Sequence, residues 1–182
     1  METKSTFWKS AMIYGLYIGI IITLYSVILY VAGQSTNKNL GYASILIYAV
    51  CIVIAQIHYR ESELNGYISY GQGVGFAVAT MLFSGIITAL YTLIIFKIDP
   101  GMVEQIRIVQ EEALLQQGLT EEQIEQAMSL TSKMMTPGWI SIMSIFNGVI
   151  YGTIISLVSS IFVKKKANEN AFDEAMEDVK TE

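Results

Sequence analysis

Residues 66–100 read GYISYGQGVGFAVATMLFSGIITALYTLIIFKIDP, and this stretch decides the fold class. It has no charged side chain before Lys97. Roughly 20 apolar residues cross the hydrocarbon core of a bilayer as a helix, so the stretch is longer than one perpendicular span requires. Because glycine weakens a helix by roughly 1 kcal/mol, the alternating glycines over residues 71–75 predict an interfacial lead-in, with the span proper beginning near them.

Three more apolar blocks accompany this stretch. Of the 182 residues, 53% are hydrophobic and 15% are charged, and the mean hydropathy is +0.48. A soluble domain carries about a quarter charged residues. We therefore expect an all-α integral membrane bundle of four transmembrane helices, forming one membrane domain over residues 1–166. The spans are predicted at about residues 8–32, 40–58, 70–97 and 137–163.

The polar insert between the third and fourth spans, residues 99–135, is predicted to be an extramembrane helical hairpin. Asp99 can cap its first helix, and Gly118 can end it. Thr120 and Gln123 have the spacing of a capping box, which predicts the start of the second helix. The alternative is that each helix extends a span and the insert forms one long stalk.

The distribution of basic residues predicts the orientation. Four spans place both termini on one side, and the positive-inside rule favours the cytoplasm for that side. Its basic residues are Lys4, Lys9, Arg60, Lys164, Lys165 and Lys166. The other side holds Lys38, Lys97, Arg107 and Lys133. Residues 167–182 are then an acidic cytoplasmic tail, whose apolar residues over 171–179 indicate a short helix.

Small residues recur at every fourth position in three of the spans. Lipid and leucine are equally apolar, so close backbone approach and interhelical hydrogen bonds hold membrane helices together. We expect these faces to point into the bundle, although one of them facing a partner subunit is the alternative. The second span has only Cys51 and Ala55 of this kind and is expected to be peripheral. The small residues singled out are Gly15, Gly19, Gly71, Gly75, Thr80, Ser84, Thr88, Gly148, Gly152 and Ser156.

Asn147 is the most polar residue deep in the last span. We expect it to hydrogen-bond another helix, with a substrate contact as the alternative. A solute path through the bundle predicts a polar cavity lined by Asn147 together with Thr80, Ser84, Thr88 and Ser156. If these residues instead pack against neighbouring helices without a water-accessible cavity, the hypothesis of a solute path fails.

The sequence shows no constellation typical of an enzyme, and we expect none. The single histidine, His58, lies at a span end beside Arg60 and Glu61. An enzyme at the inner surface would use these three residues together with Gln72. The acids of the insert are expected to be solvated, since no EF-hand-like loop is present, so neither a metal nor a cofactor is expected. No basic stripe interleaved with aromatics indicates nucleic-acid binding.

Several motifs together resemble a known family. They are FWKSAMIYGLYIGI at residues 7–20, YGQGVGFA at 70–77, SGIITALY at 84–91 and KIDP at 97–100. They resemble the bacterial membrane proteins grouped as domain of unknown function 4199, over residues 7–165. The resemblance implies a four-span protein of the bacterial inner membrane with an extended segment before the last span. It transfers no functional residues, because the family has no established activity.

These observations leave two hypotheses for function. The first is a structural or accessory protein of the membrane, in contact with the lipid bilayer and with a protein partner or a second copy through its insert or tail. The alternative is a subunit of a pore or carrier for a neutral small solute. The spans contain no acidic or basic residue near the membrane midplane, which disfavours an ion-coupled carrier.

Overall fold

The computed structural model describes residues 2–132 and 135–165. Its helices are α1 (Glu2–Val31), α2 (Lys38–Glu63), α3 (Tyr70–Ile98), α4 (Gly101–Gln116), α5 (Glu121–Ser132) and α6 (Pro137–Val163). Four of them, α1, α2, α3 and α6, are long and apolar enough to cross a membrane. The predicted all-α membrane bundle is confirmed. The tail over residues 167–182, with its expected helix, lies outside the described residues.

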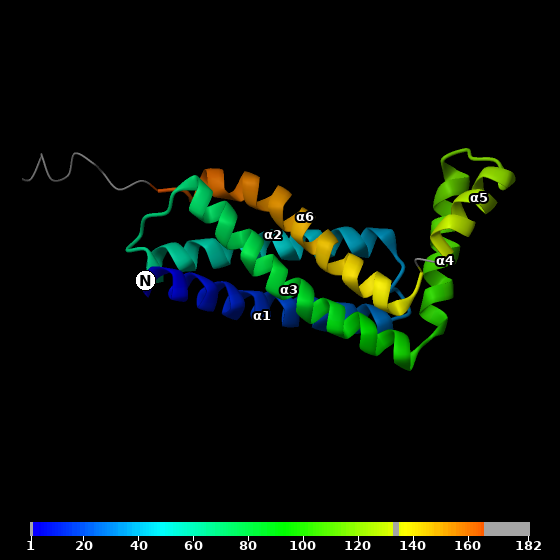
Figure 1. Ribbon diagram of the computed structural model, residues 1–182, viewed down its shortest axis with the longest axis horizontal. Helices are drawn as coiled ribbons and strands as arrows, with labels where there is room; N and C mark the ends of the chain where they lie inside the picture. Colours follow the sequence, from blue (N-terminus) through cyan, green and yellow to red (C-terminus); the bar gives the residue numbers. More distant parts are fainter. Residues whose placement is uncertain (1, 133–134, 166–182) are drawn as a thin grey trace, which may run out of the picture.

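The four long helices lie side by side, as Figure 1 shows. The N-terminus and the end of α6 lie at one end of the bundle, here called the terminal end, and α4 and α5 lie at the other, the hairpin end. Helix α3 packs most extensively, against α6 and α1, and α2 packs mainly against α6. The central position predicted for the third span and the peripheral position predicted for the second are both confirmed.

Helix α3 begins at Tyr70 and contains all three alternating glycines. Ser69 caps it, because its Oγ accepts from the Gln72 N–H at 3.3 Å and Gln72 Oε1 accepts from the Ser69 N–H at 3.0 Å. This capping box offsets the weak helix propensity of the glycines. The predicted lead-in is therefore confined to the residues before Tyr70, where Ile68 and Lys165 exchange two backbone hydrogen bonds of 2.9 and 3.0 Å.

Some of the small residues bring backbones together and others do not. A Cβ on Gly15 would lie 2.6 Å from the Thr80 carbonyl oxygen, and one on Gly152 would collide with the Met81 side chain. Gly19 likewise packs on α3, at Ile87. By contrast, a Cβ on Gly71, Gly75 or Gly148 would meet nothing within 4 Å. Glycine therefore allows close approach of α1 to α3 and of α3 to α6 at particular positions. It does not do so at every glycine of the four-residue repeats.

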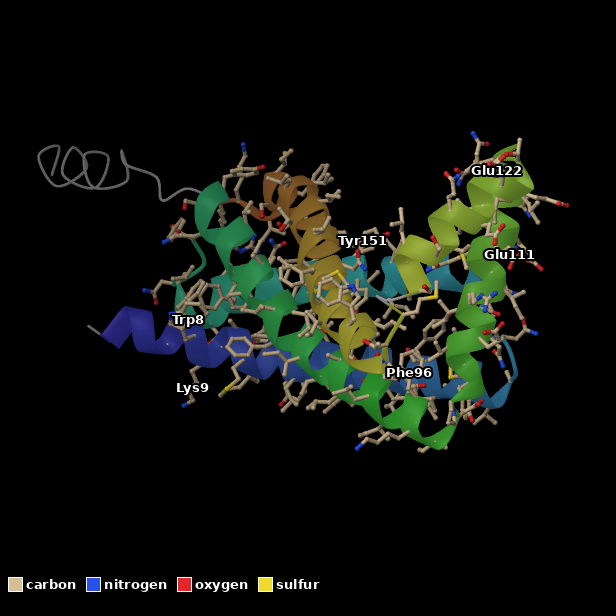
Figure 2. All side chains as sticks on the ribbon, turned by 45° about the vertical axis from the view of Figure 1, so that its right-hand side comes forward. Trp8, Lys9, Phe96, Glu111, Glu122 and Tyr151 are labelled. Atoms are coloured by element: carbon tan, nitrogen blue, oxygen red, sulfur yellow. The ribbon has the colours of Figure 1, made fainter. Side chains whose placement is uncertain are left out.

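The insert forms two helices that pack on each other, as predicted for a hairpin. The Asp99 carboxylate accepts from the Gly101 N–H at 3.0 Å at the start of α4, and Gly118 follows its end with φ of 79°. Thr120 and Gln123 make the predicted capping box, with hydrogen bonds of 3.0 and 3.4 Å. Figure 2 shows Glu111 and Glu122 on this hairpin, far from Lys9 near the terminal end.

The first turn of α4 covers part of the hairpin end of the bundle. Met102 is buried in a cluster with Ile95 and Phe96, which Tyr30 and Ile140 flank. This cluster lies over the ends of α1, α3 and α6 and fixes the hairpin to them.

Candidate functional site

A cavity of about 550 Å³ lies in the half of the bundle nearer the hairpin. Helices α2 and α6 form its walls, and α1 and α3 form its floor; we call it the α2–α6 cleft. Ligand sites commonly have volumes of roughly 300–1,000 Å³. The cleft is lined by Ile22, Ser26, Lys38, Gly41, Tyr42, Ser44, Ile45, Tyr48, Thr88, Tyr91, Thr92, Ser144, Asn147, Gly148 and Tyr151.

Every serine and threonine hydroxyl that lines the cleft already donates a hydrogen bond within the protein. Each donates to a carbonyl of its own helix, at 2.6 to 3.0 Å. A hydroxyl that donates once still has lone pairs with which to accept. The floor and walls therefore present mainly acceptor oxygens, from Ser26, Ser44, Thr88, Thr92 and Ser144.

Asn147 does not hydrogen-bond another helix, contrary to the expectation from sequence. Its side chain is exposed on the cleft wall and has no hydrogen-bond partner within residues 2–132 and 135–165. An amide that lacks a partner at membrane depth is costly, by several kcal/mol in hydrocarbon. The residue therefore needs water, a ligand or another chain to complete its hydrogen bonds.

Thr80, Ser84, Thr88 and Thr92 lie four residues apart and share one face of α3. The two halves of this face have different environments. Thr88 and Thr92 line the cleft, whereas Thr80 and Ser84 are buried below it, 1% and 0% exposed. Their hydroxyl oxygens have no hydrogen-bond partner in the described chain. Ser156, also 0% exposed, donates to the Thr153 carbonyl at 2.8 Å. Of the five residues predicted to line a solute path, Thr88 and Asn147 line the cleft. The other three, Thr80, Ser84 and Ser156, are buried between helices.

Gln56 joins three helices at the terminal end of the bundle. Its side chain is fully buried; Nε2 donates to the Gly73 carbonyl at 3.0 Å and to Ser160 Oγ at 2.9 Å. Its Oε1 accepts from Ser159 Oγ at 2.7 Å. Gln56 is not among the residues predicted from the sequence, although it is the only amide side chain within the predicted second span and could have been recognised by that polarity.

A second contact ties α2 to α6 at the same end. Arg60 Nη1 donates to the Val163 carbonyl at 2.9 Å, and Arg60 also pairs with Glu61. Walls α2 and α6 are therefore joined at the terminal end, and the cleft lies where they separate.

The four groups considered for an enzyme serve separate local contacts. His58 Nδ1 lies 2.6 Å from the Tyr14 hydroxyl, whereas Gln72 caps α3 through Ser69. Arg60 and Glu61 form the ion pair described above. Among residues 2–132 and 135–165, the only hydrogen bonds and ion pair between two of these four groups join Arg60 to Glu61.

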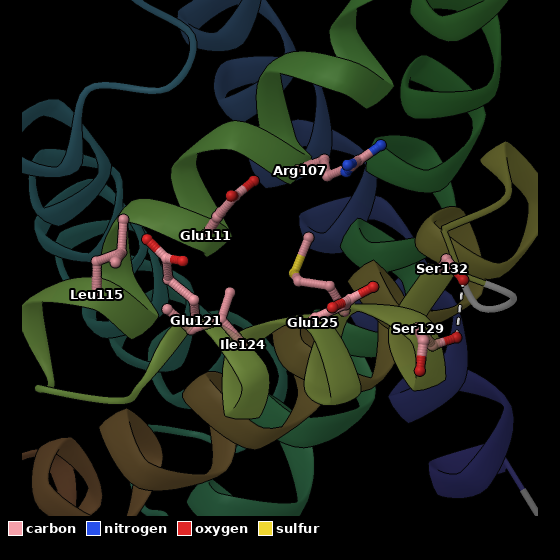
Figure 3. Close-up of a pocket in the computed structure, with 9 residues that line it drawn as sticks. Arg107, Glu111, Leu115, Glu121, Ile124, Glu125, Ser129 and Ser132 are labelled. Atoms are coloured by element: carbon pink, nitrogen blue, oxygen red, sulfur yellow. Dashed lines mark hydrogen bonds between the residues drawn. The ribbon is translucent and has the colours of Figure 1, made fainter.

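A second cavity, of about 540 Å³, lies between α4 and α5, and Figure 3 shows the residues that line it. Arg107 and Glu111 belong to α4, and Glu121 and Glu125 belong to α5. Within residues 2–132 and 135–165, no group of three His, Cys, Asp or Glu residues is placed to hold a metal ion. Its charged side chains are exposed to solvent, and Leu115, Met128 and the buried Ile124 form an apolar part of its lining.

Comparison with known proteins identifies the family. The family described as "protein of unknown function (DUF4199)" matches residues 13–165, and the chain belongs to it. No curated protein and no solved structure matches the chain. Family membership assigns no activity to the chain.

Proposed function

We propose that the chain is an accessory membrane protein that binds a small molecule or a lipid with at least one polar group in the α2–α6 cleft. The observation that carries the proposal is the unpaired Asn147 side chain on the wall of a cavity of about 550 Å³. Ligand pockets combine apolar walls with a few polar groups that fix the orientation. Lys38 is the only charged residue of the lining, so a neutral or anionic ligand fits better than a cation.

A carrier for a neutral solute is the second candidate. The polar groups of α3 continue below the cleft through Ser84 and Thr80, and α2 and α6 are closed at the terminal end by the Gln56 hydrogen bonds. A carrier must open this end, whereas a binding protein can leave it closed. A permanently open pore is disfavoured, because Thr80, Ser84 and Ser156 are packed without solvent contact.

For location, we propose the bacterial inner membrane, with both termini in the cytoplasm. Arg60, Lys164 and Lys165 lie at the terminal end, which supports a cytoplasmic position for that end. A protein partner or a second copy at the hairpin is also proposed, because α5 contacts little besides α4 and leaves its polar surface free. Affinity purification in a mild detergent tests this; loss of every associated protein at that step would contradict it.

Filling the cleft tests the proposed function directly. Gly148 lines the cleft, and a Cβ there meets nothing within 4 Å, so Gly148→Leu is expected to add side-chain volume to the cavity. Gly75 is an exposed glycine of α3 with equal space around it, outside the cleft, and Gly75→Leu is the matched control. Both changes raise helix propensity, so folding is expected to survive.

The measurement is mass spectrometry of small molecules and lipids that co-purify with each variant in a mild detergent. Wild-type protein and Gly75→Leu should retain a molecule that Gly148→Leu has lost. An identical set of bound molecules in all three proteins would show that the cleft holds no ligand.

A further inference from the structure

We infer that the ligand of the cleft is a phospholipid of the surrounding bilayer, which enters sideways between α2 and α6 and places its phosphate against Lys38. The inference rests on the proposed function and deepens it by naming the class of ligand. It follows from the direction in which the cleft opens, its depth, and the order of chemical groups along it.

The cleft opens to the side of the bundle. Its two walls are hydrogen-bonded to each other only at the terminal end, through Gln56 and Arg60, among the residues that the structure describes. At the hairpin end α2 is tied instead to α1, because the Tyr25 hydroxyl donates to the Leu40 carbonyl at 2.9 Å. Tyr42 on one wall and Tyr151 on the other remain 68% and 46% exposed. The gap between the walls therefore faces the lipid.

Entry along the bundle axis is restricted on the α1–α3–α6 side. The first turn of α4 lies there, with Met102 packed on Ile95 and Phe96. A smaller cavity of about 250 Å³ lies under this turn and shares Ser26 and Thr92 with the cleft. The site therefore extends beneath the hairpin into a mainly apolar cavity, while its wide side faces the membrane.

The depth of the cleft matches one leaflet. Lys38 is the first residue of α2, and Tyr48 lies about 15 Å further along the helix at 1.5 Å per residue. This is about half of the hydrocarbon thickness of roughly 30 Å. Figure 2 shows Tyr151 midway along α6, which places the other wall at a comparable depth.

The order of groups along the cleft follows that of a phospholipid. Lys38 lies at the membrane surface and forms no ion pair within residues 2–132 and 135–165, so its charge is available to a phosphate. Ser44 lies about 9 Å deeper by helical rise, between Lys38 and the membrane midplane. Ile45 and Tyr48 continue the wall toward the acyl region. A site for a water-soluble ligand would not require a gap between α2 and α6 that is open to the lipid over this whole depth.

The test uses the full chain in vesicles of phosphatidylethanolamine that contain a small fraction of a photoreactive lipid. One preparation carries phosphatidylglycerol with a diazirine in its acyl chain, and the other carries the matching diacylglycerol, which lacks the phosphate. After irradiation, mass spectrometry identifies the cross-linked peptides. With the phosphatidylglycerol probe, we expect them to contain Tyr48 and Tyr151 above the background of other lipid-facing segments.

Charge variants then test the phosphate contact. Lys38→Glu should lower cross-linking of the phosphatidylglycerol probe in the cleft by about fivefold or more, as expected for one lysine at an anionic surface, and Lys38→Gln should lower it less. Lys97→Glu alters another exposed lysine near the hairpin end, outside the cleft, and should leave cross-linking unchanged. The diacylglycerol probe should respond to none of these changes.

Two results would overturn the inference. Equal cross-linking in Lys38→Glu and Lys97→Glu would remove the phosphate contact, and unchanged cross-linking in Gly148→Leu would place the lipid outside the cleft. If Gly148→Leu loses a co-purifying water-soluble molecule while its lipid cross-linking is unchanged, the proposed function stands and the phospholipid is wrong.

Discussion

At the scale of single residues, two amides in the spans have opposite surroundings. Gln56 is fully buried and uses both its oxygen and its nitrogen in contacts with α3 and α6. Asn147 has no partner in the described chain and borders the cleft. Within a membrane the first arrangement holds helices together, and the second leaves hydrogen-bonding capacity for something outside the chain.

This contrast predicts different effects on stability. Gln56→Leu removes three interhelical hydrogen bonds, each worth roughly 0.6 kcal/mol in membrane proteins, so we expect a loss of about 2 kcal/mol. Asn147→Leu removes no interaction within the described chain and should cost nothing measurable. Denaturant unfolding in detergent without added lipid compares the two variants. Equal losses of stability would show that Gln56 does not hold the three helices together.

Part of the candidate site could be predicted from the sequence. A four-residue spacing correctly groups Thr80, Ser84 and Thr88 on one helical face. It cannot show where a neighbouring helix diverges from that face. In the structure Ile52 of α2 is buried in the cluster around Met81, and nearer the hairpin α2 moves away from α6 and opens the cleft. That divergence depends on tertiary contacts between distant segments.

At the scale of elements, local capping signals predicted the hairpin well. The spacing of Thr120 and Gln123 correctly predicted how α5 begins. The same spacing of Ser69 and Gln72 starts α3, where the glycines that follow argued for a later start. Packing on α1 and α6 overrides their low propensity, so the whole glycine segment is helical.

Close packing between α1 and α3 yields a second stability prediction. A methyl group on Gly15 would lie 2.6 Å from the Thr80 carbonyl oxygen, so Gly15→Ala must push α1 and α3 apart. We expect a loss of about 1–3 kcal/mol, the usual cost of overpacking. Gly71→Ala has open space around it and should stabilise α3 by up to about 1 kcal/mol through helix propensity. Unfolding both variants side by side measures this difference, and a Gly15→Ala protein as stable as Gly71→Ala would refute close packing there.

At the scale of the whole molecule, the hydrogen bonds between helices are unevenly distributed. The terminal end is joined by the Gln56 contacts, by Arg60 to Val163, and by the backbone pairing of Ile68 with Lys165. At the hairpin end, the cleft separates α2 from α6. A bundle whose helices are hydrogen-bonded at one end and separated at the other can admit a ligand between two helices while the remaining contacts persist. Both the binding hypothesis and the carrier hypothesis therefore use the α2–α6 cleft.

The orientation of this asymmetric bundle decides which leaflet the cleft faces. The basic residues Arg60, Lys164 and Lys165 lie at the terminal end, so we expect that end in the cytoplasm and the cleft open to the outer leaflet. Cys51 is the only cysteine, and Cys51→Ser provides a background for new ones. In it, Ser129→Cys on the exposed surface of α5 should react with a membrane-impermeant maleimide on intact cells. Lys164→Cys, equally exposed, should react only after the membrane is permeabilised, and the opposite pattern would assign the cleft to the inner leaflet.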